Sequence, residues 1–128
     1  SYGYKVRAYL KHDQIRRSKA YNIYKKSSKN LIQLINVENY KSFYQITEKI
    51  LVQFISDKLN LKSQNIPTIE LIDRLKEKDV DEITCNEISE LINKSKSIAY
   101  APLVSAKEEM NNDFDNLDRI IKNLDQQI

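Results

Sequence analysis

The sequence contains very little glycine or proline, with one Gly and two Pro among 128 residues. Tight turns between β-strands rely on glycine, because it adopts positive φ angles without strain. A β-sandwich, a barrel or an open α/β sheet is therefore excluded as the expected fold. Hydrophobic residues make up 41% of the chain and charged residues 30%, as in an ordinary folded protein. We expect one all-α domain, a bundle of about five helices.

Cysteine and histidine are equally scarce. Cys85 is the only cysteine, which excludes an internal disulfide and a multi-cysteine zinc site. It falls in the first turn of an expected helix, where the dipole can lower a thiol pKa, although a structural thiol is the simpler interpretation. His12 is the only histidine, so any nucleophile–histidine pair would have to use it. We predict that the chain is not an enzyme and has no catalytic residues and no cofactor.

No motif for metal or phosphate binding stands out. Asp113, Asp115 and Asp118 are close in sequence, but they lack the glycine turn and the distal glutamate of a calcium loop. They also fall inside a strong helical period, so we interpret them as a solvated helix face. Gly3 is the only glycine, which excludes a glycine-rich phosphate loop. We predict no metal site.

The net charge of +3 is distributed unevenly. Residues 1–30 hold nine basic residues against Asp13 alone, a balance of +8, which leaves −5 for the other 98 residues. The basic residues are Lys5, Arg7, Lys11, Arg16, Arg17, Lys19, Lys25, Lys26 and Lys29. No apolar run is long enough for a membrane span, and the chain shows no apolar signal core. A basic arm therefore precedes a mildly acidic body.

Tyrosines are interleaved with these cations, namely Tyr2, Tyr4, Tyr9, Tyr21 and Tyr24. One interpretation is nucleic-acid binding, with cations on phosphates and rings stacked on bases. A second is a membrane surface, where cations meet anionic headgroups. A third is an exposed helix face whose rings help to cover the core. The residues alone leave these three interpretations open.

Apolar residues of helical spacing dominate residues 37–61 and predict a central helix at 39–59. Steps of three and four stack side chains on one face, here Phe43, Ile46, Ile50, Phe54 and Ile55. Leu51, Val52 and Leu59 widen the apolar surface beyond one stripe. We therefore expect this helix to be contacted from more than one side.

Weaker patterns predict the other four helices. We expect them over residues 13–35 and 69–78, and from capping boxes at Thr84–Glu87 and Ser105–Glu108. Residues 1–12 have no clear period and are interpreted as a lead-in, which leaves 13–128 as the helical domain. Asn36 should end the first helix or begin the next, and Asn60 should end the central one. Ile69 is expected among the buried residues of its short helix.

From Ala20 onward, roughly 100 of the 128 residues resemble the C-terminal helical region of the BatD family, the Bacteroides-type aerotolerance (oxygen tolerance) proteins of Bat operons. The motifs that carry the resemblance are Phe43-Tyr44, Asp57-Lys58-Leu59-Asn60-Leu61, a short helix ending near Val80-Asp81, and Ala99-Tyr100-Ala101-Pro102 before the last helix. The chain departs from the family at Lys96, Ser97 and Ile98, where an acidic residue and an aromatic residue are frequent.

The resemblance implies a non-enzymatic interaction domain on the cytoplasmic side of an inner-membrane protein, following an upstream transmembrane helix. It implies partners resembling BatA, BatB and BatC and a MoxR-type ATPase. A basic juxtamembrane segment then fits the positive-inside rule, with Lys5, Arg7, Lys11, Arg16, Arg17, Lys19, Lys25 and Lys26 as candidate membrane-surface residues. Tyr100 and Pro102 are candidate docking residues, because the loop there lies between two helices and carries an aromatic ring. The simpler interpretation is that Tyr100 packs internally and Pro102 only ends its helix.

Overall fold

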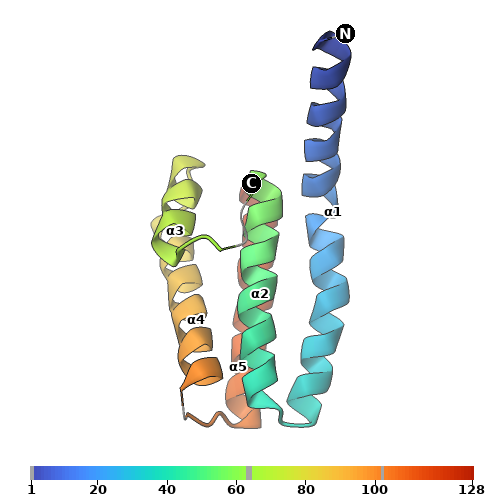
Figure 1. The fold of residues 1–128 in the computed structure, drawn as a ribbon. Helices are drawn as coiled ribbons and strands as arrows, with labels where there is room; N and C mark the ends of the chain where they lie inside the picture. The colour runs from blue at the N-terminus through green and yellow to red at the C-terminus, as the bar shows by residue number, and fades with distance from the viewer. Residues whose placement is uncertain (1, 63–64, 102) are drawn as a thin grey trace.

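The computed structural model describes residues 2–62, 65–101 and 103–128, with side-chain surroundings at residues 3 and 8 and from residue 11 onward. Within these ranges the chain forms five α-helices and no strand. The helices are α1 (Tyr2–Asn36), α2 (Tyr40–Leu59), α3 (Thr68–Glu77), α4 (Glu82–Tyr100) and α5 (Lys107–Gln127). The expected all-α bundle is confirmed (Figure 1).

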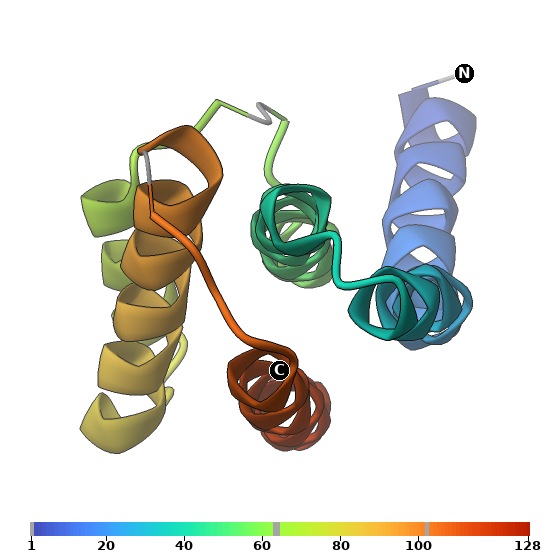
Figure 2. The same ribbon diagram turned by 90° about the horizontal axis from the view of Figure 1, so that it is seen from below.

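Helix α2 lies at the centre of the bundle. It packs against α1, α4 and α5, while the short α3 packs on α4. Viewed along the helices, α1 and α4 lie on opposite sides of α2, and α5 lies on a third side, below α2 in the picture (Figure 2). The central position predicted for residues 39–59 is therefore confirmed, and no helix among the described residues covers the remaining side of α2.

The core is built around the aromatic residues of α2. Phe43 and Tyr44 are fully buried with their rings edge to face at 4.9 Å between centroids, and Phe54 is 2% exposed. Met110, Leu117 and other residues of α5 complete the buried cluster. Burial of one such side chain contributes about 1.5 to 3 kcal/mol, which offsets the entropy lost in ordering the chain.

The turns use side-chain-bearing residues where many proteins use glycine. Glu38, Asn60 and Asp79 have φ angles of 56°, 54° and 62°. Asn60 ends α2 in the left-handed conformation, as predicted. The prediction for Asn36 is wrong in part, because Glu38 takes the left-handed position and Asn39 caps α2 by accepting a hydrogen bond from the Ser42 N–H.

Helix α1 begins much earlier than predicted. The expected start near residue 13 is wrong, because Ala8, Leu10 and the basic residues of the first turns are good helix formers that tolerate one glycine. Arg16 reaches Asp57 and Leu61 at the end of α2, so residues 2–15 extend beyond the bundle (Figure 1). At 1.5 Å per residue this projecting part is about 20 Å long.

Both predicted capping boxes are wrong. Asp81 caps α4 instead of Thr84, since its carboxylate accepts hydrogen bonds from the Thr84 N–H at 2.9 Å and hydroxyl at 2.8 Å. Helix α5 begins after Ala106 without a side-chain cap, because the Ser105 hydroxyl donates to Glu109.

The short helix is close to its prediction, but Ile69 is 79% exposed and does not belong to the core. Among the described residues, no helix combines the length and hydrophobicity needed to cross a bilayer.

Candidate functional site

The first candidate surface is a row of cations on α1, which we call the outer face. Its members are exposed and fall within about a third of the helix circumference at 100° per residue. They are Lys11, Lys19, Lys25, Lys26 and Lys29. The side chains of Lys5 and Arg7, also candidate membrane-surface residues, lie outside those that the structure describes.

Arg16 and Arg17 of α1 are engaged with the bundle. Arg16 is half-buried, and its guanidinium donates to Asp57 Oδ1 at 2.8 Å and to the Leu61 carbonyl at 2.9 Å. Arg17 is exposed and donates to the Ile128 carbonyl at 2.9 Å. These contacts hold α1 to the ends of α2 and α5, so the outer face is left with lysines.

Two of the tyrosines of α1, Tyr21 and Tyr24, have described side chains, whereas those of Tyr2, Tyr4 and Tyr9 lie outside the described ones. Tyr24 is 2% exposed, packs edge to face on Phe54 at 6.5 Å and donates its hydroxyl hydrogen to Asp118 at 2.7 Å. Burial, followed by the hydrogen bond to Asp118, raises the pKa of Tyr24 far above its usual value. Tyr21 is half-buried, with Lys25 over its ring at 5.7 Å. Tyr24 therefore covers the core and is not available to stack on a base.

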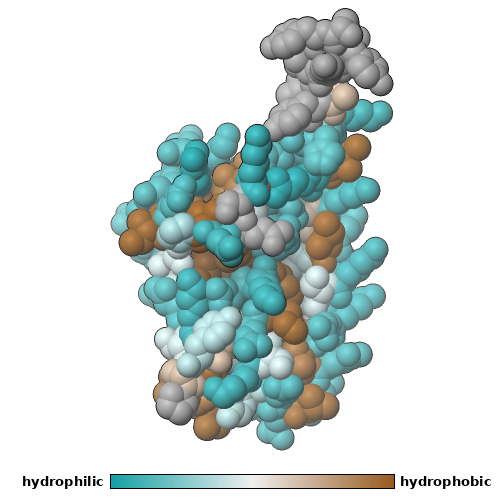
Figure 3. Space-filling model, in the orientation of Figure 1, coloured by the Kyte–Doolittle hydropathy of each residue, from teal (hydrophilic) through white to brown (hydrophobic). Residues whose placement is uncertain are grey.

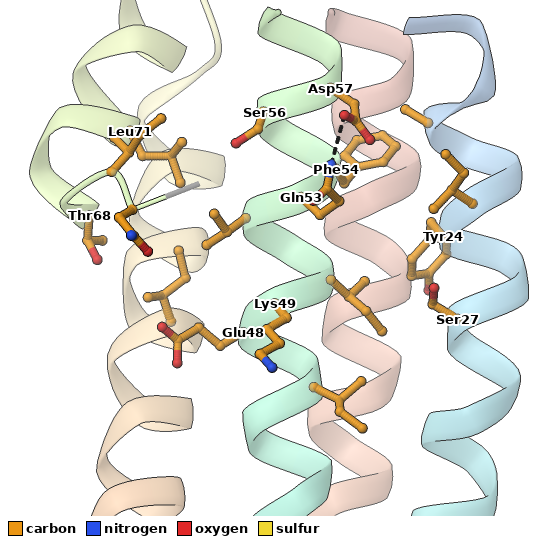
Figure 4. A pocket seen from close by; sticks show the side chains of 18 of the residues that line it. Tyr24, Ser27, Glu48, Lys49, Gln53, Phe54, Ser56, Asp57, Thr68 and Leu71 are labelled. Carbon is orange, nitrogen blue, oxygen red and sulfur yellow. Dashed lines mark hydrogen bonds between the residues drawn. The ribbon is translucent and has the colours of Figure 1, made fainter. Parts of the chain in front are cut away.

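The second candidate surface is a groove of about 870 Å³ along the open side of α2, which we call the α2 groove. Helices α1 and α4, with α3 and the segment before it, form its walls. Its apolar surface includes Ile23, Ile46, Val52, Ile66 and Leu71. Figure 4 shows Tyr24 and Ser27 on the α1 side, Thr68 and Leu71 on the α3 side, and the residues of α2 between them.

The charges inside the α2 groove are largely paired. Asp57 accepts from Arg16 and from the Gln53 side-chain amide, both at 2.8 Å, and the second of these bonds is drawn in Figure 4. Glu48 lies 3.9 Å from Lys96. Lys49 is exposed and forms no ion pair with any described residue.

Tyr100 lies at the surface and lines the α2 groove from the end of α4. Its exposure of 70% shows that the alternative of internal packing is wrong. Lys41 of α2 reaches the carbonyls of Ile98 and Ala101 at 3.3 and 2.8 Å, which ties this end of α4 to the start of α2. Pro102, the other candidate docking residue, lies outside the described residues.

A buried polar cluster joins α2, α4 and α5. The Tyr44 hydroxyl donates to Asp113 Oδ2, which also accepts from Lys94 Nζ at 2.9 Å. Lys94 further pairs with Glu109 at 2.8 Å. Partial burial opposes the charge on Lys94, but the bonds to Glu109 and Asp113 outweigh it and raise the lysine pKa. We interpret the cluster as structural, because its donors and acceptors satisfy one another.

Asp113, Asp115 and Asp118 do not form one solvated face, contrary to the prediction. Asp113 is 6% exposed in the polar cluster, and Asp118 bonds Tyr24 and Lys122, while Asp115 is exposed. No group of three or more metal-ligating side chains is found in the part of the chain that the structure describes.

The residues considered for nucleophilic chemistry are placed differently. Cys85 is fully buried and its thiol donates to the Val80 carbonyl at 3.7 Å. Burial is the main reason that the pKa of Cys85 is raised rather than lowered by the helix start. His12 is exposed on the projecting part of α1. The geometry of Cys85 fits the structural interpretation of its thiol.

Apart from the candidate Tyr100 at its edge, the α2 groove was not predicted from the sequence. Ile46 and Val52 carry the signal, because they broaden the apolar face of α2 and remain only half-buried. We expected helices of the same chain to cover them.

Fold and surfaces together define a small all-α bundle with a projecting basic helix and an apolar groove. The chain matches no family model, no curated protein and no solved structure. The BatD-like assignment therefore stays a prediction from the sequence.

Proposed function

We propose that this chain is a non-enzymatic interaction domain of a BatD-like membrane protein, held by α1 at the cytoplasmic face of an inner membrane. There it would dock partners resembling the Bat proteins or a MoxR-type ATPase. The observation that carries the proposal is the outer face of α1, whose lysines are exposed on a helix that projects past the bundle.

The spacing of these lysines favours contact along the helix. Lys11 and Lys29 are 18 residues apart, about 27 Å at 1.5 Å per residue, and share one face. A helix lying on an anionic surface brings all of them near headgroups, whereas an upright helix brings only the first. Each lysine near such a surface contributes about 1 kcal/mol, and salt weakens the attraction.

Vesicle binding tests the proposal. Wild-type protein should co-sediment with vesicles containing phosphatidylglycerol but not with pure phosphatidylcholine. The triple variant Lys11→Glu, Lys25→Glu, Lys29→Glu should lose about 3 kcal/mol, or about a hundredfold in affinity. A matched control is Lys76→Glu, Lys78→Glu, Lys107→Glu, which changes three exposed lysines elsewhere by the same total charge. Equal losses in the two variants, or no binding by wild type, would refute membrane contact through α1.

Nucleic-acid binding is the alternative function. The same lysines suit phosphates, but the burial of Tyr24 removes one of the rings that stacking would use. Single-stranded RNA and duplex DNA should therefore compete poorly with anionic vesicles at about 0.15 M salt. If either nucleic acid displaces the protein from vesicles at low concentration, with affinity falling steeply in salt, the alternative replaces the proposal.

A further inference from the structure

The open side of α2 carries apolar side chains that no helix among the described residues covers. Helices α1, α4 and α5 cover three sides of α2, and the α2 groove follows the fourth. Ile46 and Val52 are half-buried there, and Ile23 on the α1 wall is 46% exposed. Figure 3 shows apolar surface in the middle of this face, bordered by hydrophilic side chains. A second element with an apolar stripe would bury these side chains.

Among the charged residues that line the α2 groove, only Lys49 remains once the internal pairs are set aside, and two further lysines lie beside the groove on α1. Asp57 is neutralised by Arg16, and Glu48 faces Lys96. Lys19 and Lys26 lie one turn on either side of Ile23 on α1, and Lys49 lies on α2. None of these three lysines forms an ion pair with a described residue. We call Lys19, Lys26 and Lys49 the rim lysines; Lys19 and Lys26 also belong to the outer face of α1, at its edge nearest Ile23.

We propose that the α2 groove binds an acidic amphipathic helix of a protein partner, laid along α2 between α1 and α4. Its apolar stripe contacts Ile23, Ile46 and Val52, and its flanking carboxylates face the rim lysines. This is the helix-in-groove mode, in which anchors recur at steps of three and four residues. This inference names the chemistry of the protein partner that the proposed function would dock. It rests on the proposed function only in assuming that the domain docks a protein partner.

Charge separates this occupant from the others. A second copy would have to offer a strongly acidic helix face with an apolar stripe, but the apolar stripe of α5 is already buried in the core. Lipid would meet the outer face of α1 before the α2 groove, because Lys11, Lys25 and Lys29 point away from Ile23 on the helix. An acidic helix matches both the apolar floor and the cationic rim.

A peptide display library tests the inference without lipid. The library is helical, with Leu at i, i+3, i+4 and i+7 and with flanking positions varied among Glu, Gln and Lys. It is selected on wild-type protein, on the rim variant Lys19→Glu, Lys26→Glu, Lys49→Glu, and on the control Lys76→Glu, Lys78→Glu, Lys107→Glu. The two variants carry the same net charge, and circular dichroism and thermal melting check their folds.

Wild-type protein and the control should enrich Glu at the flanks, and the rim variant should enrich Lys. The best acidic peptide, measured by fluorescence anisotropy, should bind the rim variant at least tenfold more weakly. Amide shifts in NMR spectra should cluster on α1 and α2 around Ile23, Lys49 and Val52. The variant Lys11→Glu, Lys25→Glu, Lys29→Glu, which should lose vesicle binding, should bind the peptide as tightly as the wild type does. Peptide binding in the groove and membrane contact through α1 can therefore fail independently.

Four outcomes would overturn the inference. In the first two, the wild-type protein enriches no peptide, or the wild-type protein and the rim variant enrich peptides with the same flanking residues. In the third, the NMR amide shifts caused by the peptide lie away from the α2 groove. In the fourth, the wild-type protein self-associates and the rim substitutions make it a monomer. The last outcome would assign the groove to a second copy of the chain.

Discussion

Removal of the Tyr44 hydroxyl should measure what the buried polar cluster contributes to stability. Tyr44 is fully buried, its hydroxyl donates to Asp113, and the Ser105 hydroxyl lies 3.2 Å away. Tyr44→Phe keeps the ring and creates almost no cavity. A hydrogen bond to a charged group contributes about 1.5 to 3 kcal/mol. Because Asp113 keeps its bond to Lys94, we expect a loss near the lower end, about 2 kcal/mol.

Urea unfolding at pH 7 provides the assay. With a slope of about 2 kcal/mol per molar for a chain of this size, the midpoint should fall by about 1 M. Tyr100→Phe is the matched control, because Tyr100 is exposed and should change stability by less than about 0.5 kcal/mol. A double-mutant cycle with Asp113→Asn should show a coupling of at least about 0.5 kcal/mol. A loss no larger than that of the control, or a coupling of zero, would refute the assigned hydrogen bond.

Four further predictions concern other parts of the fold. Glu38→Gly should raise the free energy of unfolding by about 0.5 to 1 kcal/mol, because glycine relieves the positive φ; a loss of stability on urea unfolding would contradict this. Arg16→Ala should speed amide hydrogen exchange in the projecting part of α1 and leave α4 unchanged; equal exchange in wild type and variant would show that Arg16 does not anchor the helix. Ile50→Asp should cost about 3 kcal/mol or more, measured by thermal melting, since it places a carboxylate where 8% of the side chain is exposed; a neutral result would contradict the core position. The melting temperature should hold above about pH 5 and fall as the pH drops through and below about 4. The hydrogen bond from the Thr84 N–H lowers the pKa of Asp81, and Lys94 lowers that of Glu109, so the unfolded chain binds more protons than the folded chain in this pH range. Asp81→Asn should make the melting temperature depend less on pH, and an unchanged dependence would contradict this cause.

The helical architecture was predictable because two strong signals agreed. Scarce glycine excluded sheets, and the apolar spacing of residues 39–59 placed a helix within one residue of α2. The stop at Asn60 was also predictable, since asparagine tolerates the left-handed conformation better than most residues.

Helix starts were less predictable, because several residues can cap the same backbone N–H groups of the first turn, which have no hydrogen-bond partner within the helix. Asp81 and Thr84 both suit an N-cap, and the aspartate is the stronger of the two. Ser105 could have capped α5, but its hydroxyl bonds Glu109, a contact that depends on the tertiary arrangement. No local pattern predicts that outcome.

The candidate sites were predictable only in part. The exposed lysines of α1 followed from charge counting, but the engagement of Arg16 by Asp57 joins residues 41 positions apart in the chain. The α2 groove was difficult to predict because the sequence pattern assigned Val52 to the core, whereas the structure leaves its side chain half-buried. Periodicity reports which side chains are apolar, and not how many neighbours the rest of the chain supplies.

Helix α1 is one continuous helix whose two parts have different surroundings. Its first turns stand outside the bundle, while Ile23 and Ser27 further along form a wall of the α2 groove. The bonds of Arg16 to Asp57 and Leu61 lie where the projecting turns meet the bundle. Beyond them Ala20, Tyr24 and Leu31 are buried in the core, so the α1 wall of the groove is positioned by core packing and not by the projecting turns.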